Sequence, residues 1–97
     1  MEAAKKIEIV ISATQENKLY DLLDQFEIKS YTLIDNVKGK GERGWQDASG
    51  LTDAFTNIYL LTTCQHEEFE KLKEPLRKLL ERSGGVCIVT DSHILKH

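Results

Sequence analysis

The sequence lacks a dense set of cysteines and any long apolar run. Cys64 and Cys87 do not have the close spacing of a zinc or redox motif, and without a secretory signal we expect reduced thiols. No apolar run approaches the roughly 18 residues of a membrane span, so we expect no direct membrane insertion. The first residues contain no apolar stretch of signal-peptide length, which favours a cytoplasmic protein.

A basic surface is also missing, since the formal net charge is −3. General nucleic-acid binders gain most of their non-specific affinity from positive charge, so we expect no nucleic-acid partner and only a local anion site. Pro75 is the single proline, and 40% hydrophobic with 30% charged residues exclude a disordered or collagen-like chain. The 97 residues suit one domain over 1–97 that folds without metal or disulfide staples.

The hydrophobic pattern predicts four strands and two helices. Alternation predicts strands, and a 3.6-residue repeat of leucines predicts helices. The strands are expected at 7–12, 31–38, 54–63 and 86–90, and the helices at about 14–27 and from Phe69 to about Arg82. Pro75 should kink the second helix or mark a late restart. Residues 91–97, including the short tail 92–97, are expected to be solvated.

The order βαββαβ predicts an α+β, ferredoxin-like fold, with an antiparallel sheet and both helices on one face. The strand at 54–63 is apolar on both faces, because Ile58 and Leu60 point one way while Phe55, Tyr59 and Leu61 point the other. On the second face Val10, with Val89 or Cys87, adds to this excess. We therefore expect another subunit to cover that face.

Glycines and cations gather in two segments. Residues 37–44 place three cations among three glycines at the start of a long loop, 39–53, and residues 82–85 read Arg-Ser-Gly-Gly. Glycines allow close backbone approach, so successive N–H groups can hold an oxyanion while a cation supplies charge. Taken alone, the two segments also fit a glycine-rich hairpin end and a helix C-cap. Facing each other across a subunit boundary, they would make a shared phosphate site.

Three short motifs follow one another along the chain: Tyr31-Thr32-Leu33, Val37-Lys38-Gly39-Lys40-Gly41 and Ser83-Gly84-Gly85-Val86. With the chain length and element order, they resemble the PII signalling family. Residues 39–44 resemble in particular the small PII-like proteins associated with bicarbonate transport and carboxysome operons. The resemblance implies a homotrimer that binds adenine nucleotides in clefts between its subunits. It also implies a flexible loop, about 41–53, that responds to the ligand and docks on a membrane transporter or other target.

The resemblance also assigns nucleotide-binding residues. The base of the family's T-loop, where backbone and cations meet phosphate, matches Gly39, Lys40, Gly41 and Arg43. The family's second nucleotide loop matches Gly84, Gly85, Val86 and Cys87. Thr32 matches the family's threonine near the T-loop base, although alignment on Val-Lys-Gly places Leu33 there.

The chain departs from the nitrogen-regulating members of that family. Its loop carries Trp45 and no modifiable tyrosine, the second loop lacks Asp-Gly-Lys, and no arginine pair stands near the C-terminus. Each lost charge-assisted contact removes about 1.5–3 kcal/mol, which weakens triphosphate binding. We therefore expect AMP, ADP or a cyclic nucleotide, with or without bicarbonate, rather than ATP with 2-oxoglutarate.

Two other hypotheses stay open. A metal-binding trimer resembling the divalent-cation tolerance proteins would use His66, His93 and His97, which lack a cysteine or carboxylate to complete a ligand set. A regulatory domain of the ACT type predicts a dimer with an amino-acid ligand. No Ser-His-Asp or Cys-His pairing suggests itself, so we expect no enzyme, no catalytic residue and no bound metal.

Overall fold

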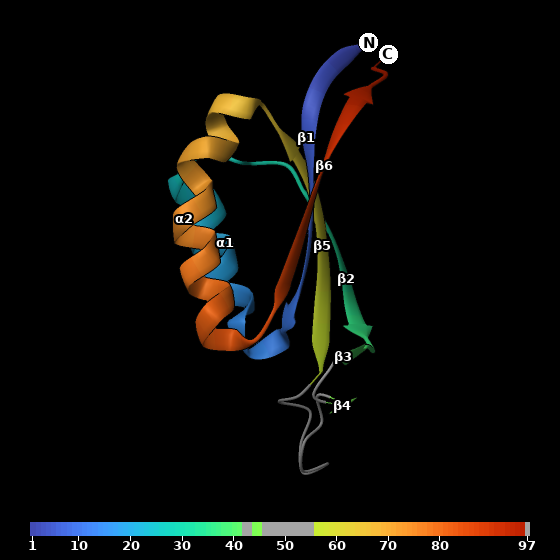
Figure 1. Ribbon diagram of the computed structural model, residues 1–97, viewed down its shortest axis with the longest axis vertical. Coiled ribbons are helices and arrows are strands. Elements are labelled where there is room, and N and C mark those ends of the chain that lie inside the picture. Colours follow the sequence, from blue (N-terminus) through green and yellow to red (C-terminus); the bar gives the residue numbers. More distant parts are fainter. Residues whose placement is uncertain (42–43, 46–55, 97) are drawn as a thin grey trace.

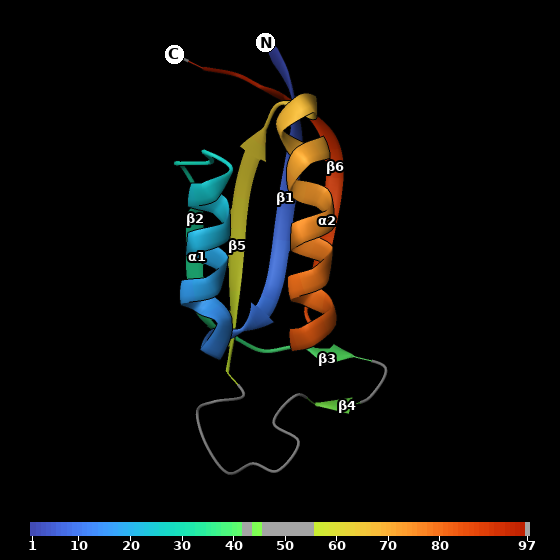
Figure 2. The same ribbon diagram turned by 90° about the vertical axis from the view of Figure 1, so that its left-hand side faces the viewer.

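The structure is a computed structural model that describes residues 1–41, 44–45 and 56–96. A four-stranded sheet in the order β2-β5-β1-β6 forms one layer, and two helices cover one of its faces (Figures 1 and 2). The elements are β1 (Glu2–Ser12), the 3-10 turn η1 (Ala13–Gln15), α1 (Glu16–Gln25), β2 (Thr32–Val37), β5 (Asn57–Cys64), α2 (His66–Ser83) and β6 (Val86–Ile94). Every neighbouring pair in the sheet is antiparallel. The predicted ferredoxin-like βαββαβ fold is confirmed.

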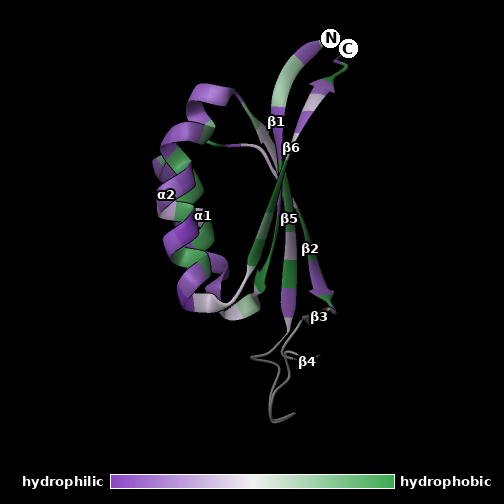
Figure 3. Ribbon diagram, viewed as in Figure 1, coloured by the Kyte–Doolittle hydropathy of each residue, from purple (hydrophilic) through white to green (hydrophobic). Residues whose placement is uncertain are grey.

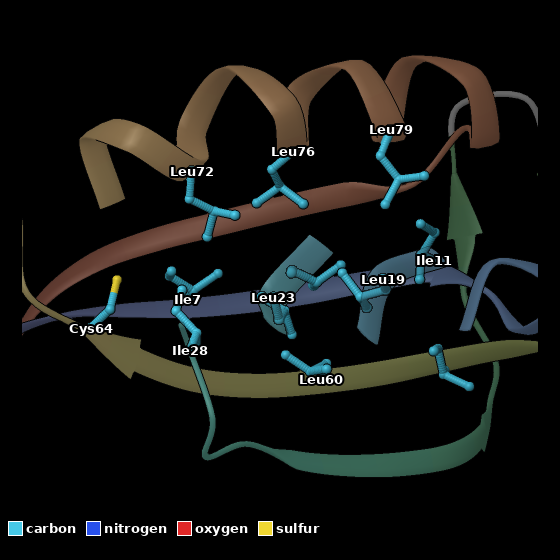
Figure 4. Close-up of a cluster of buried hydrophobic side chains, with 12 residues drawn as sticks. Ile7, Ile11, Leu19, Leu23, Ile28, Leu60, Cys64, Leu72, Leu76 and Leu79 are labelled. Atoms are coloured by element: carbon cyan, nitrogen blue, oxygen red, sulfur yellow. The ribbon is translucent and has the colours of Figure 1, made fainter. Parts of the chain in front are cut away.

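The core lies between the sheet and the helices (Figure 4). The alternation of β1 turns Ile7, Ile9 and Ile11 toward the helices, and each is at most 1% exposed. Leu72 and Leu76, which lie on one face of α2, pack against this cluster and are also buried. Figure 3 shows the complementary pattern, with the outward face of α2 hydrophilic.

The α2 helix runs without interruption through Pro75. We expected Pro75 to kink the helix or to mark a late restart; the late restart is wrong, because α2 already begins at His66. Pro75 cannot donate a backbone hydrogen bond, but Leu72, Leu76 and Leu79 are buried on both sides of it and hold the helix on the sheet. The helix begins where the Glu68 side chain accepts a hydrogen bond of 2.7 Å from the Gln65 N–H.

Strands β1 and β6 are longer than their hydrophobic pattern predicted. Residues Glu2–Ala4 pair with Ser92–Ile94, so the last strand runs to Ile94 instead of ending at the expected Thr90, while Asp91 and His93 are exposed, as expected for this segment. Ion pairs of 2.6 Å between Lys5 and Asp91 and of 3.2 Å between Glu2 and Lys96 join the two terminal segments along this stretch. These residues do not alternate between apolar and polar, so the hydrophobic pattern of the sequence does not reveal that they pair.

The register sets which side chains lie on the face of the sheet away from the helices, called here the open face. Val10 pairs with Tyr59 and Val86, and Glu8 pairs with Leu61 and Ile88, so these six share it. Ile34, opposite Tyr59, joins them from β2. Val86 and Ile88, rather than the expected Val89 or Cys87, carry the apolar character of β6 here. Phe55, also expected on this face, lies outside the described residues.

The long loop expected over 39–53 is not structureless throughout. Two short strands, β3 (Lys40–Gly41) and β4 (Gly44–Trp45), pair as an antiparallel ladder separate from the main sheet. In this ladder Lys40 pairs with Trp45 and Gly41 with Gly44. Figure 1 shows the ladder at the end of the sheet opposite the chain termini. The rest of the predicted loop lies outside the described residues.

Candidate functional site

A cavity of about 490 Å³ lies where β1 ends and β6 begins. Four segments distant in sequence meet around it: the end of β1, the residues after β2, the start of β5, and the turn between α2 and β6. The lining residues are Val10, Ile11, Ser12, Val37, Lys38, Gly39, Asn57, Tyr59, Ser83, Gly84, Gly85 and Val86. Small-molecule sites typically enclose about 300–1,000 Å³, so the size suits a ligand as large as a nucleotide.

The turn between α2 and β6 forms one side of the cavity. Gly84 has a φ of 78°, the left-handed conformation that ends a helix, and its N–H donates to the Leu80 carbonyl at 2.8 Å. At Gly85 a Cβ atom would lie 2.7 Å from the Val10 carbonyl oxygen and 2.9 Å from Leu80 Cδ2. Because these two glycines have no side chains, the turn packs closely against β1, and its backbone is accessible to a ligand.

The segment after β2 forms the facing side. Asn36 has a φ of 57°, and the register between β2 and β5 shifts between Ile34 and Val37. This irregularity turns the chain out of the sheet, so that Lys38 and Gly39 border the cavity. Lys38 is exposed and is the one lysine or arginine among the described lining residues. It supplies the positive charge that an anionic group needs there.

The wall toward the open face is apolar except for one hydroxyl group. Val10 lies between Tyr59 and Val86 across the neighbouring strands, and the Tyr59 hydroxyl donates a hydrogen bond of 2.6 Å to Glu8 Oε2. Lys6 Nζ lies 3.6 Å from Glu8 Oε1. The hydrogen bond from Tyr59, with the nearby ammonium group of Lys6, lowers the pKa of Glu8, and the same hydrogen bond raises the pKa of Tyr59. Such a wall can accept the planar face of a base.

The structure brings four of the residues assigned from the sequence together, namely Gly39, Gly84, Gly85 and Val86. Lys40 and Gly41 follow Gly39 directly in β3, while Arg43 lies outside the described residues. Two others do not line the cavity. Thr32 pairs with Leu61 and faces the open side of the sheet, and Cys87 pairs with Ile9 and faces the helices.

Sequence reasoning missed several lining residues, among them Ser12, Asn57 and Tyr59. Each stands at or near the end of an element that leads to the cavity. Tyr59 was expected on the second face of its strand, but nothing in the local pattern connects that face to the glycine segments. The topology supplies the connection, because β1 lies between β5 and β6 and ends beside both.

Two absences concern the described part of the chain only. Over residues 1–41, 44–45 and 56–96, no three histidine, cysteine or acidic side chains are grouped as a metal site. Neither α1 nor α2 has a stretch long and apolar enough to cross a bilayer.

A ferredoxin-like sheet with a glycine-lined cavity at the ends of β1 and β2 defines a class of small α+β domains with space for a small molecule. Within that class, the model of the family described as nitrogen regulatory protein P-II matches residues 4–97. The chain therefore belongs to the P-II family, a family of regulatory proteins, as the resemblance of its motifs indicated. No curated protein sequence matches the chain significantly.

Solved structures agree with this assignment. CPII, a nitrogen regulatory PII-like protein from Thiomonas intermedia K12, was solved bound to ADP, AMP and bicarbonate. It is 26% identical to this chain, with a TM-score of 0.82, and the match covers 98% of this chain and 96% of CPII. CPII bound to ADP and bicarbonate is 28% identical, with a TM-score of 0.82 and 97% and 90% covered. The GlnK-ATP complex of B. subtilis, at 15% identity, a TM-score of 0.65 and 95% and 84% coverage, shares the fold.

Proposed function

We propose that this protein is a PII-like regulator that binds an adenine nucleotide, AMP or ADP in preference, at clefts between the subunits of a homotrimer. The observation that carries the proposal is the cavity in which Gly39 and Lys38 face the Gly84-Gly85 turn. CPII, which shares this fold, was solved with ADP, AMP and bicarbonate, which supports the same ligands here.

The chemistry of the cavity suits a nucleotide with few phosphates. The apolar wall of Val10, Val86 and Tyr59 receives the base, and the two glycine segments offer backbone to the phosphates. Lys38 is the cation of the described lining, and Arg43, assigned from the sequence, would add a second. Two cations per site favour AMP, ADP or a cyclic nucleotide over a triphosphate, with bicarbonate as a further anion.

The position of the cavity supports a site completed by a second chain. Val10, Tyr59 and Val86 belong both to its wall and to the open face. That face exposes Ile34, Val86 and Ile88 by 51%, 51% and 56%, more apolar surface than a sheet facing water normally keeps. Packing three open faces together would bury these side chains and close the cavity on that side. A dimeric or metal-binding role has no comparable support in the described residues.

The regulatory output is proposed to run through the loop at about 41–53, which begins at the cavity. Ligand in the cavity would set the conformation of the segment that leaves Gly39, and this segment would dock on a partner such as a bicarbonate or related membrane transporter. In this proposal the protein is a cytoplasmic regulator and not an enzyme.

Calorimetric titration with AMP, ADP, ATP and cyclic AMP, with and without bicarbonate, tests the nucleotide proposal, together with the mass of the purified protein. We expect about one site per subunit. Lys38→Ala and Arg43→Ala should each weaken binding tenfold or more, since charge-assisted hydrogen bonds contribute about 1.5–3 kcal/mol. Lys18→Ala, on the exposed side of α1, is the control for charge alone. A trimer that binds none of the four nucleotides would contradict the proposal.

A further inference from the structure

Tyr59 connects two features that the proposed function treats separately. Its ring lines the cavity, and its side chain lies on the open face of the sheet. Its hydroxyl donates to Glu8 Oε2 at 2.6 Å, and Glu8 lies on β1 on the same face as Val10 of the cavity wall. Glu8 is not among the residues that line the cavity.

The surroundings of Glu8 give this hydrogen bond its importance. Its cross-strand neighbours are Leu61 on β5 and Ile88 on β6, both apolar. Lys6, 3.6 Å away, is the ammonium group that pairs with the carboxylate. A carboxylate between apolar side chains loses free energy when it has no hydrogen-bond partner. The hydrogen bond from the Tyr59 hydroxyl therefore stabilises Glu8 in this position.

From this geometry we propose that Glu8 is a positioning residue for the cavity. By accepting the hydrogen bond, its carboxylate holds the Tyr59 ring as the wall where the cavity meets the open face. The inference rests on the proposed nucleotide function for its consequence, because an anchored ring loses less freedom when a planar base packs against it. Because Glu8 lies on the open face, a change in what covers that face would also change the affinity of the cavity for its ligand.

The experiment compares Glu8→Ala, Glu8→Gln, Tyr59→Phe and the double variant Glu8→Ala/Tyr59→Phe. Glutamine keeps an oxygen that can accept from the tyrosine hydroxyl, whereas alanine does not. Glu2→Ala, which removes the same charge from the far end of β1, is the matched control. Each variant is compared at a concentration where its mass equals that of the wild type.

The first measurement needs no ligand. Protein with carbon-13 in the tyrosine rings is recorded by NMR, and the signal absent from Tyr59→Phe identifies Tyr59. We expect Glu8→Ala to shift and broaden that signal, and Glu8→Gln and Glu2→Ala to leave it near its wild-type position. An unchanged Tyr59 signal in Glu8→Ala would overturn the anchor.

The second measurement is ADP affinity by calorimetry. Glu8→Ala and Tyr59→Phe should each weaken ADP binding about three- to tenfold, the loss expected for one hydrogen bond, and Glu8→Gln by less than about twofold. The double variant should bind no more weakly than either single variant, because both remove one interaction. Additive losses, or equal affinities in Glu8→Ala and wild type, would overturn the positioning role. A wild type that does not bind ADP would overturn the nucleotide proposal, while the NMR result still decides the anchor.

Discussion

Truncation of one side chain on the open face should dissociate the proposed trimer. Ile88 is 56% exposed in the single chain, which leaves about half of its side chain to be buried by other subunits. Full burial of an isoleucine is worth about 1.5–3 kcal/mol, so this remainder is worth about 0.8–1.7 kcal/mol per chain and about 2.5–5 kcal/mol for three copies. Ile88→Ala should forfeit most of it and raise the dissociation constant by about two to three orders of magnitude.

Sedimentation velocity over a dilution series measures this shift, with circular dichroism on the same samples to show that the chain stays folded. Leu95→Ala is the control, because Leu95 is 83% exposed and follows the last residue of β6. The wild type should sediment with the mass of three chains and Ile88→Ala should dissociate at higher concentration. A wild-type monomer, or an Ile88→Ala variant that dissociates at the same concentration as wild type and Leu95→Ala, would refute the assignment of the open face as the interface.

Three other outcomes follow from the contacts described. Gly85→Ala should lower the free energy of unfolding in urea by about 1–3 kcal/mol, because its Cβ meets the Val10 carbonyl oxygen and the turn cannot shift freely. The pKa of Glu8 is lowered from its ordinary value of 4.5 in the folded chain, so the stability it adds is present above pH 4.5 and is lost as the pH falls through the lowered value. The difference in free energy of unfolding between wild type and Glu8→Gln should therefore shrink as the pH drops below 4.5. Burial raises the pKa of both the Cys64 and the Cys87 thiols to about 11. Iodoacetamide at pH 8 should therefore label each thiol far more slowly in the native protein than in urea, which peptide mass spectrometry measures.

The fold was predictable from sequence where hydrophobic spacing carried the information. The alternation of Ile7, Ile9 and Ile11 predicted a half-buried strand, and those residues are the buried face of β1. The pattern failed where pairing depends on polar residues, as at Asp91, whose contact with Lys5 at the other end of the chain extends both strands. At Pro75 the leucine spacing predicted the helix correctly, and only the late restart is absent, because buried leucines on both sides of the proline hold α2 on the sheet.

The candidate site was less predictable, because it is made by contacts between distant segments. Residues Lys38 and Gly39 and the Gly84-Gly85 turn could be named from composition, and the structure places them around one cavity. Tyr59 became part of the site only through topology, since β5 reaches the cavity across β1. The open face was predicted from two-sided apolarity, but its β6 members, Val86 and Ile88, required the register.

The two glycines of the α2–β6 turn do not by themselves indicate a ligand. Gly84 is explained by the left-handed end of α2, and Gly85 by the approach of Val10, so the fold demands both even without a nucleotide. Gly39 is different, because a Cβ there would meet no atom within 4 Å. A Gly39→Ala variant should thus keep the wild-type free energy of unfolding and lose ADP affinity, if the ligand approaches the backbone at this position. Unchanged affinity would mean that the phosphates bind elsewhere along the cavity, and Lys38→Ala would then show whether this side takes part at all.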